Sequence, residues 1–162
     1  MDILQVIKAD NINILGLIRH LFCYDSCLKI PVFFGQFETE VILQFNLKKT
    51  YIYPELLSFC NSSDRFVDES IKRQEQILEY IKNIKSKIRN GGWELNEYNK
   101  SISELESLIK SHFNAEESVM FPKFRRNMPT YEREELNELI MDFKREWLSH
   151  KHESKELGGY YF

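Results

Sequence analysis

His112 and Glu116 are the two residues whose types and spacing point most directly to chemistry. They are four positions apart, so on a helix they share one face. An imidazole nitrogen and a carboxylate oxygen on one face can together bind iron or another divalent cation. The same two residues could instead form a hydrogen-bonded buried pair without a metal, because buried polar side chains normally have partners. The sequence leaves both interpretations open.

Four further polar side chains stand at helical spacing within apolar stripes, so they should point at the core. These residues are Asn11, Gln44, Lys48 and Gln74. Lys48 is the charged member of the group, and it could reach solvent past the end of its helix. We expect it to lie inside and to pair with Glu116, with the amides and His112 completing the hydrogen bonding.

Five segments with helical periodicity must position these residues. The expected helices cover about residues 2–24, 32–59, 65–89, 93–126 and 131–150. Pro31 should open the second helix, and Pro54 should kink or loosen its last turn. Short connections make consecutive helices antiparallel neighbours. The prediction is therefore an all-α, up-down-up-down four-helix bundle over about 2–126, with an additional short C-terminal helix over about 131–150.

The polar residues should lie at one depth in this bundle. With a rise of about 1.5 Å per residue, each lies roughly 13–22 Å from the helix end on one common side of the bundle. On the fourth helix His112 and Glu116 stand between Ile109 and Val119, which should also face inward. Polar groups from four helices at one level are typical of a site in a bundle core.

This pattern resembles the hemerythrin-like, HHE-type cation-binding domains. Residues 112–122 (HFNAEESVMFP) are similar to the family element His-x-x-x-Glu-Glu followed by Phe/Tyr-Pro. Residues 7–11 (IKADN) and 44–54 (QFNLKKTYIYP) are similar to two further elements, with amides and lysines where the family has histidines and acids. Gln74 stands where the third-helix histidine would be. The resemblance covers most of residues 1–126 and implies the hemerythrin-like fold.

The departures from the family pattern concern metal binding. The resemblance implies a di-iron centre with four histidines and two glutamates, of which His112 and Glu116 remain. An ammonium group about 4 Å from a metal cation would cost several kcal/mol, so Lys48 disfavours a metal. We therefore expect no cofactor, and a vestigial core site at Asn11, Gln44, Lys48 and Gln74. The alternative is a reduced iron site that uses His112 and Glu116.

Composition narrows the function classes. The 162 residues suit a single domain over 1–162, and the formal charge of −3 predicts no nucleic-acid partner. No apolar run is long enough to span a membrane, and a cytoplasmic location is expected. No nucleophile–base pair or phosphate loop stands out, which predicts a non-enzymatic binding or regulatory scaffold. Its partner, a protein or a small molecule, is unknown, and a homodimer is an open option. The alternative is a metal-dependent oxygen, redox or iron sensor.

The remaining cysteines and histidines are expected to be inert. Cys23 and Cys27 are four positions apart, but no second pair has zinc spacing. With Cys60 they make an odd number, which predicts reduced, buried thiols without a disulfide framework; zinc binding or redox sensing is the alternative. The histidines that we expect on the surface or in a short tail over 151–162 are His20, His150 and His152.

Overall fold

The structure, a computed structural model, describes residues 1–23, 29–61, 64–91 and 93–156, and the side chains up to residue 150. Every regular element within these residues is a helix, so the all-α prediction is confirmed. The elements are α1 (Ile3–Arg19), α2 (Ile30–Leu47), a π-helical segment η1 (Lys48–Ile52), α3 (Tyr53–Ser58), α4 (Phe66–Asn90), α5 (Leu95–Asn127) and α6 (Thr130–Glu156).

The helix boundaries follow the local signals of the sequence. The side chain of Asp2 accepts a hydrogen bond from the backbone N–H of Leu4 and caps α1. Pro31 lies in the first turn of α2, where its missing N–H costs nothing. Gly91 ends α4 with a φ of 65°, a left-handed conformation that favours glycine. The last helix was expected to be short and to cover about 131–150, but α6 has 27 residues and continues through the start of the expected tail to Glu156.

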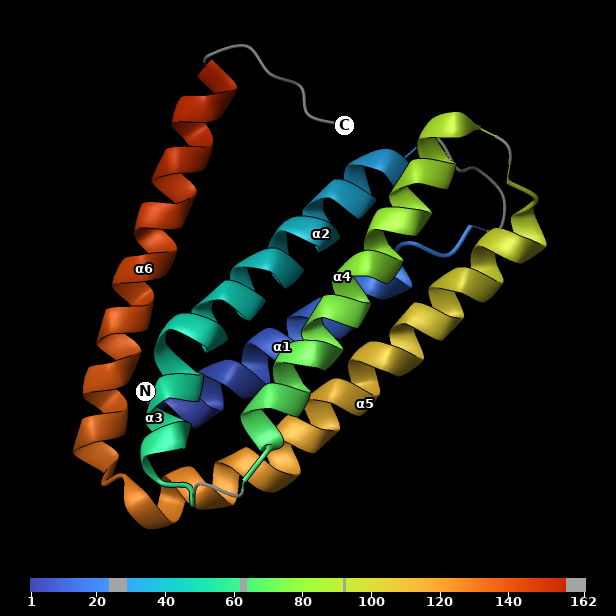
Figure 1. The fold of residues 1–162 in the computed structure, drawn as a ribbon. Coiled ribbons are helices and arrows are strands. Elements are labelled where there is room, and N and C mark those ends of the chain that lie inside the picture. Colours follow the sequence, from blue (N-terminus) through green and yellow to red (C-terminus); the bar gives the residue numbers. More distant parts are fainter. Residues whose placement is uncertain (24–28, 62–63, 92, 157–162) are drawn as a thin grey trace.

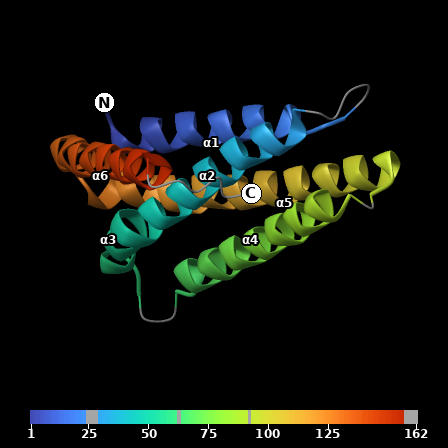
Figure 2. The same cartoon turned by 90° about the horizontal axis from the view of Figure 1, so that it is seen from above.

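Four long helices contact one another in a closed ring. α1 packs on α2 and α5, and α4 packs on the same two helices. Neighbours in the ring run in opposite directions (Figure 1). α6 contacts α1 and α2 and lies on their side of the molecule, away from α4 (Figure 2). No helix in the described part of the chain is long and apolar enough to cross a membrane.

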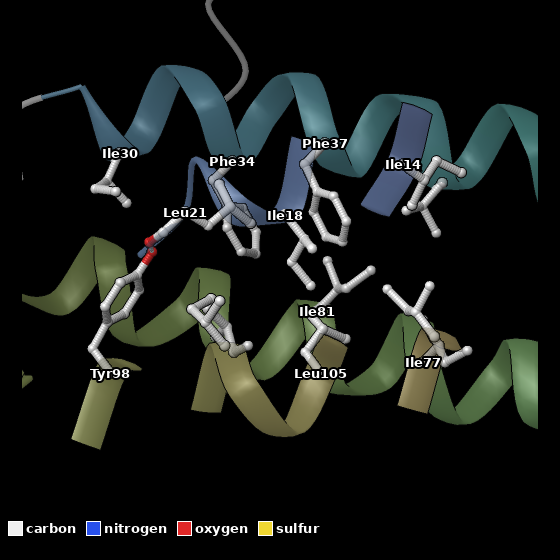
Figure 3. Close-up of a cluster of buried hydrophobic side chains, with 14 of the residues drawn as sticks. Ile14, Ile18, Leu21, Ile30, Phe34, Phe37, Ile77, Ile81, Tyr98 and Leu105 are labelled. Atoms are coloured by element: carbon white, nitrogen blue, oxygen red, sulfur yellow. Dashed lines mark hydrogen bonds between the residues drawn. The ribbon is translucent and has the colours of Figure 1, made fainter. Parts of the chain in front are cut away.

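The apolar core has two clusters, one toward each end of the ring. In the first, Phe34 and Phe37 from α2 point toward Ile81 on α4 (Figure 3). There the Tyr98 hydroxyl donates a hydrogen bond of 2.6 Å to the backbone carbonyl of Leu21. The second cluster joins the start of α1, α3 and the end of α5 to two buried residues of α6, Leu136 and Ile140.

Two sequence expectations about single residues are wrong. Val119, expected on the inward stripe of its helix, is exposed over 36% of its surface. Cys23 is buried and disulfide-bonded, whereas we expected reduced thiols. Cys27 lies outside the described residues. His20 and His150 are exposed as expected, and the side chain of His152 lies outside the described part.

Candidate functional site in the helix core

The six polar residues singled out from the sequence are all buried, with exposed fractions of at most 2%. Along each helix of the ring they lie where residues of the first apolar cluster give way to residues of the second, and Lys48 lies at the start of η1. They are Asn11, Gln44, Lys48, Gln74, His112 and Glu116. The predicted polar layer is therefore present, and it separates the two clusters.

The centre of this polar layer is an ion pair. Lys48 Nζ lies 2.8 Å from Glu116 Oε1, and both side chains are fully buried. The ammonium also donates to Asn11 Oδ1 at 3.2 Å and lies 4.7 Å from the ring centroid of Phe113. Asn11 Nδ2 in turn donates to Glu117 Oε1 at 3.3 Å. The expected pairing of Lys48 with Glu116 is thus confirmed.

A tyrosine that was not predicted from the sequence completes the hydrogen bonding of Glu116. The Tyr53 hydroxyl donates to Glu116 Oε2 at 3.1 Å. It also accepts a hydrogen bond of 3.0 Å from Gln74 Nε2, which links α4 to the ion pair. Both carboxylate oxygens of Glu116 therefore have donors, which a buried anion requires.

The π-helical segment explains why Lys48 and Tyr53 both reach Glu116. In a regular α-helix, residues five apart point about 140° away from each other. Here the Tyr53 N–H bonds to the carbonyl of Lys48, five residues back, so the wider turn returns the chain to the same side. Pro54 follows directly, and α2, η1 and α3 continue without a break. Pro54 was expected to loosen the last turn; the structure has the π segment just before it.

His112 has a partner on each side. Its Nδ1 accepts a hydrogen bond of 3.3 Å from Arg73 Nε on α4. Its Nε2 approaches Glu116 Oε1 to 3.0 Å but lacks the alignment of a full hydrogen bond, so this contact is an electrostatic one. Arg73 also donates to the hydroxyl of Ser70, which is buried.

Burial and the neighbouring charges shift the pKa values of the acids and bases in the layer. Burial alone would raise the pKa of Glu116, but the Lys48 ammonium and His112 bring it down to about 2. Burial lowers the pKa of His112 and outweighs the opposing effect of Glu116. Burial and the Glu116 carboxylate raise the pKa of Tyr53. At neutral pH the layer therefore holds a carboxylate, a neutral imidazole and a protonated phenol.

Two amide oxygens in the layer have no hydrogen-bond partner among the described residues. They are Gln44 Oε1 and Gln74 Oε1. Such groups cost about 1–3 kcal/mol each when they are left unpaired. The expected hydrogen bonding is thus complete at the two oxygens of Glu116 and incomplete at His112 Nε2 and at the two glutamines.

The donor set does not fit a metal ion. No group of three or more His, Cys, Asp or Glu side chains in the described part of the chain could hold one. The most suitable carboxylate, Glu116, already binds an ammonium through Oε1 and a phenol through Oε2. A cation placed beside it would face Lys48 at short range, which is repulsive.

Cys60 lies outside the polar layer and carries a free thiol. It is a free cysteine whose Sγ lies 3.6 Å from Lys123 Nζ, and Lys123 also pairs with Asp64. Burial and the neighbouring Asp64 raise the pKa of the Cys60 thiol, so the reactive thiolate is disfavoured. This environment gives no support to zinc binding or redox sensing at Cys60.

One curated protein has a distant likeness to this chain in sequence. No family model matches the chain, and no solved structure matches it. A protein named DNA nickase from Nostoc sp. (strain PCC 7120 / SAG 25.82 / UTEX 2576) is 25% identical over 137 residues. The match covers 83% of this chain but 37% of the relative. The chain therefore spans little more than a third of that protein, and the likeness assigns neither a family nor an activity.

Proposed function

We propose that this chain is a hemerythrin-like four-helix bundle that has lost di-iron binding and acts as a binding or regulatory scaffold. The observation that carries the proposal is the buried ion pair of Lys48 and Glu116, at 2.8 Å, in the layer where the family would place its metal ligands. The ammonium supplies the positive charge that a metal would supply, and it does so without a cofactor.

The arrangement of the helices supports the proposed fold. The ring of α1, α2, α4 and α5, with alternating directions, is the arrangement expected of an up-down-up-down bundle (Figure 1). α6 would then be an addition that packs against one side. The quoted motifs over residues 7–11, 44–54 and 112–122 fall on α1, on the continuous run of α2, η1 and α3, and on α5, and these elements meet at the polar layer.

Elemental analysis of the full chain tests the loss of metal. Protein expressed with added iron, zinc and manganese should carry less than about 0.1 metal per chain, show no absorbance beyond the aromatic band, and keep its melting temperature when a chelator is added. Near-stoichiometric iron with a charge-transfer band, or a melting temperature that falls with chelator, would overturn the proposal.

A second candidate is a metal-dependent oxygen, redox or iron sensor. The contact that favours it is the approach of His112 Nε2 to Glu116 Oε1 at 3.0 Å, which places two metal-ligating groups side by side. In a sensor of this kind Lys48→Glu would strengthen iron uptake, because it replaces a cation by a ligand. In the metal-free scaffold the same variant places a second carboxylate beside Glu116 in the core, and it should lower the melting temperature of the protein.

We do not extend the nickase activity of the Nostoc relative to this chain. The chain covers 37% of that protein, so the parts that cleave DNA need not be shared. Its formal charge of −3 also provides no basic excess for a phosphate backbone. The proposed role is therefore non-enzymatic, with a protein or a small molecule as the partner.

A further inference from the structure

Arg73 brings a second cation to the polar layer from α4. Its Nε donates to His112 Nδ1 at 3.3 Å, and one of its terminal nitrogens donates to Ser70 Oγ at 2.9 Å. The guanidinium carbon also lies 5.7 Å from the ring centroid of Phe66. These three contacts fix the guanidinium beside the imidazole, although the residue as a whole is only half-buried.

The contact with Arg73 dictates which nitrogen of His112 carries the proton. An arginine has no acceptor, so Nδ1 must present its lone pair to the Nε–H of Arg73. A neutral imidazole then carries its proton on Nε2. Nε2 lies 3.0 Å from Glu116 Oε1, so a proton on Nε2 places its partial positive charge near the carboxylate, which is electrostatically favourable although the N–H is not aligned for a full hydrogen bond. The two contacts therefore favour one and the same tautomer.

We infer that Arg73 is a positioning residue that holds His112 as the Nε2–H tautomer and thereby occupies the lone pair with which this histidine would bind a cation. The inference rests on the proposed loss of metal and deepens it. A histidine binds a metal through a nitrogen without a proton. In this chain one imidazole nitrogen carries the proton and the other accepts from Arg73.

Each of the two remaining metal-ligating residues is thus capped by its own cation. Lys48 caps Glu116 at 2.8 Å, and Arg73 caps His112 at 3.3 Å. The two caps come from different helices and touch different atoms, so neither can replace the other. Exclusion of cations from the layer is consequently a property of two positions, and Lys48 is only one of them.

Nitrogen-15 NMR of the imidazole of His112 tests the inference in the full, chelator-treated chain. The wild type should show the Nε2–H tautomer, with the Nδ1 resonance displaced from that of a free imidazole nitrogen because it accepts a hydrogen bond. Arg73→Met should move the Nδ1 resonance toward the free value, and Arg73→Lys should restore part of the displacement. Lys72→Met, at the neighbouring exposed position on α4, is the matched control and should leave it unchanged.

A wild-type spectrum with the proton on Nδ1, or with both nitrogens protonated at neutral pH, would overturn the inference without any variant. So would an Nδ1 resonance that is the same in folded Arg73→Met as in the wild type. Neither result would touch the proposed loss of metal, which elemental analysis decides separately. Conversely, a chain that carries iron before chelation would refute the proposed function whatever tautomer the metal-free form adopts.

Discussion

At the scale of single residues, the buried lysine sets the requirements of its neighbours. Moving an ammonium and a carboxylate out of water costs several kcal/mol per ion, which their attraction and their hydrogen bonds must offset. Lys48 has Asn11, Glu116 and the face of Phe113 around it, and Glu116 has Lys48 and Tyr53. The pair is therefore complete as a unit, and removal of one member leaves the other as an uncompensated charge.

A double-mutant cycle measures this dependence. Lys48→Met should lower the free energy of unfolding by about 3–5 kcal/mol, because it leaves the Glu116 carboxylate buried without a counter-ion. Lys48→Met combined with Glu116→Leu should recover most of that loss, since it replaces two charges by two apolar groups. Urea unfolding followed by circular dichroism gives the values.

Lys49→Met is the control for this cycle, because Lys49 is the next residue of the same segment and is only half-buried. It should change the free energy of unfolding by no more than about 0.5 kcal/mol. If the double variant were as unstable as the two single variants added together, Lys48 and Glu116 would not be coupled as the structure places them.

The sequence predicted some of these residues and missed others for identifiable reasons. Lys48 and Glu116 were found because each interrupts an apolar stripe at α-helical spacing. Tyr53 was not selected because it lies five positions after Lys48. In a regular α-helix it would therefore point away from the core of the protein. Arg73 stands on the half-exposed side of α4, and only the length of its side chain brings its guanidinium to His112.

At the scale of helices, the π segment η1 adjusts the register between the two halves of one long helix. It adds one residue to a turn, so that α2 and α3 both keep their apolar sides toward the core on either side of it. Helix extents could be predicted from apolar periodicity, as α4 and α5 illustrate. The single wide turn of η1 could not be predicted, because it changes neither the amino-acid composition nor the apolar stripes of the helices on either side.

Removing the extra residue tests this role of η1. Deletion of Thr50, which is exposed, puts Tyr53 four residues after Lys48, and an α-helical turn then points both side chains to the same side. Pro54→Ala should accompany it, because a proline clashes with the carbonyl four residues before it in an α-helix. We expect the combined variant to fold, with helical circular dichroism and cooperative thermal melting close to those of the wild type.

Deletion of Glu40, in the middle of α2, is the matched control. It rotates one half of α2 by about 100° relative to the other, so buried residues such as Phe34 and Phe37 leave the core. Each displaced aromatic costs about 3–5 kcal/mol, so the loss of both is comparable to the whole free energy of unfolding of an ordinary domain, about 5–15 kcal/mol. Equal stability of the two deletion variants would show that η1 does not act as a register adjustment.

At the scale of the whole molecule, α6 is an integral part of the fold. Two ion pairs tie it to α1, Arg133 with Asp2 at 2.8 Å and Lys144 with Asp10 at 2.6 Å. Phe143 packs edge-on against Tyr51 of η1, with ring centroids 5.6 Å apart. The sequence predicted this helix but not its contacts with α1 and α2, because its charged and apolar residues indicate no preference for particular neighbours.

Truncation of one buried side chain measures how firmly α6 is attached. Ile140→Ala should lower the free energy of unfolding by about 2–5 kcal/mol and speed amide hydrogen exchange in α6 before it does so elsewhere. Leu139→Ala, at the neighbouring position with 54% exposure, should have little effect on either measurement. Similar losses from both variants would mean that α6 does not pack as the structure describes.

The position of the polar layer between two apolar clusters affects how the helices align with one another along their axes. Leucines and isoleucines are tolerant partners, and a helix that slid along its axis by one turn, about 5.4 Å, could still cover much of its apolar surface. The same slip would carry Lys48 away from Glu116 and leave both charges in an apolar medium. The polar layer therefore favours one register of the helices and destabilises every shifted register. This effect does not depend on whether the layer binds a ligand.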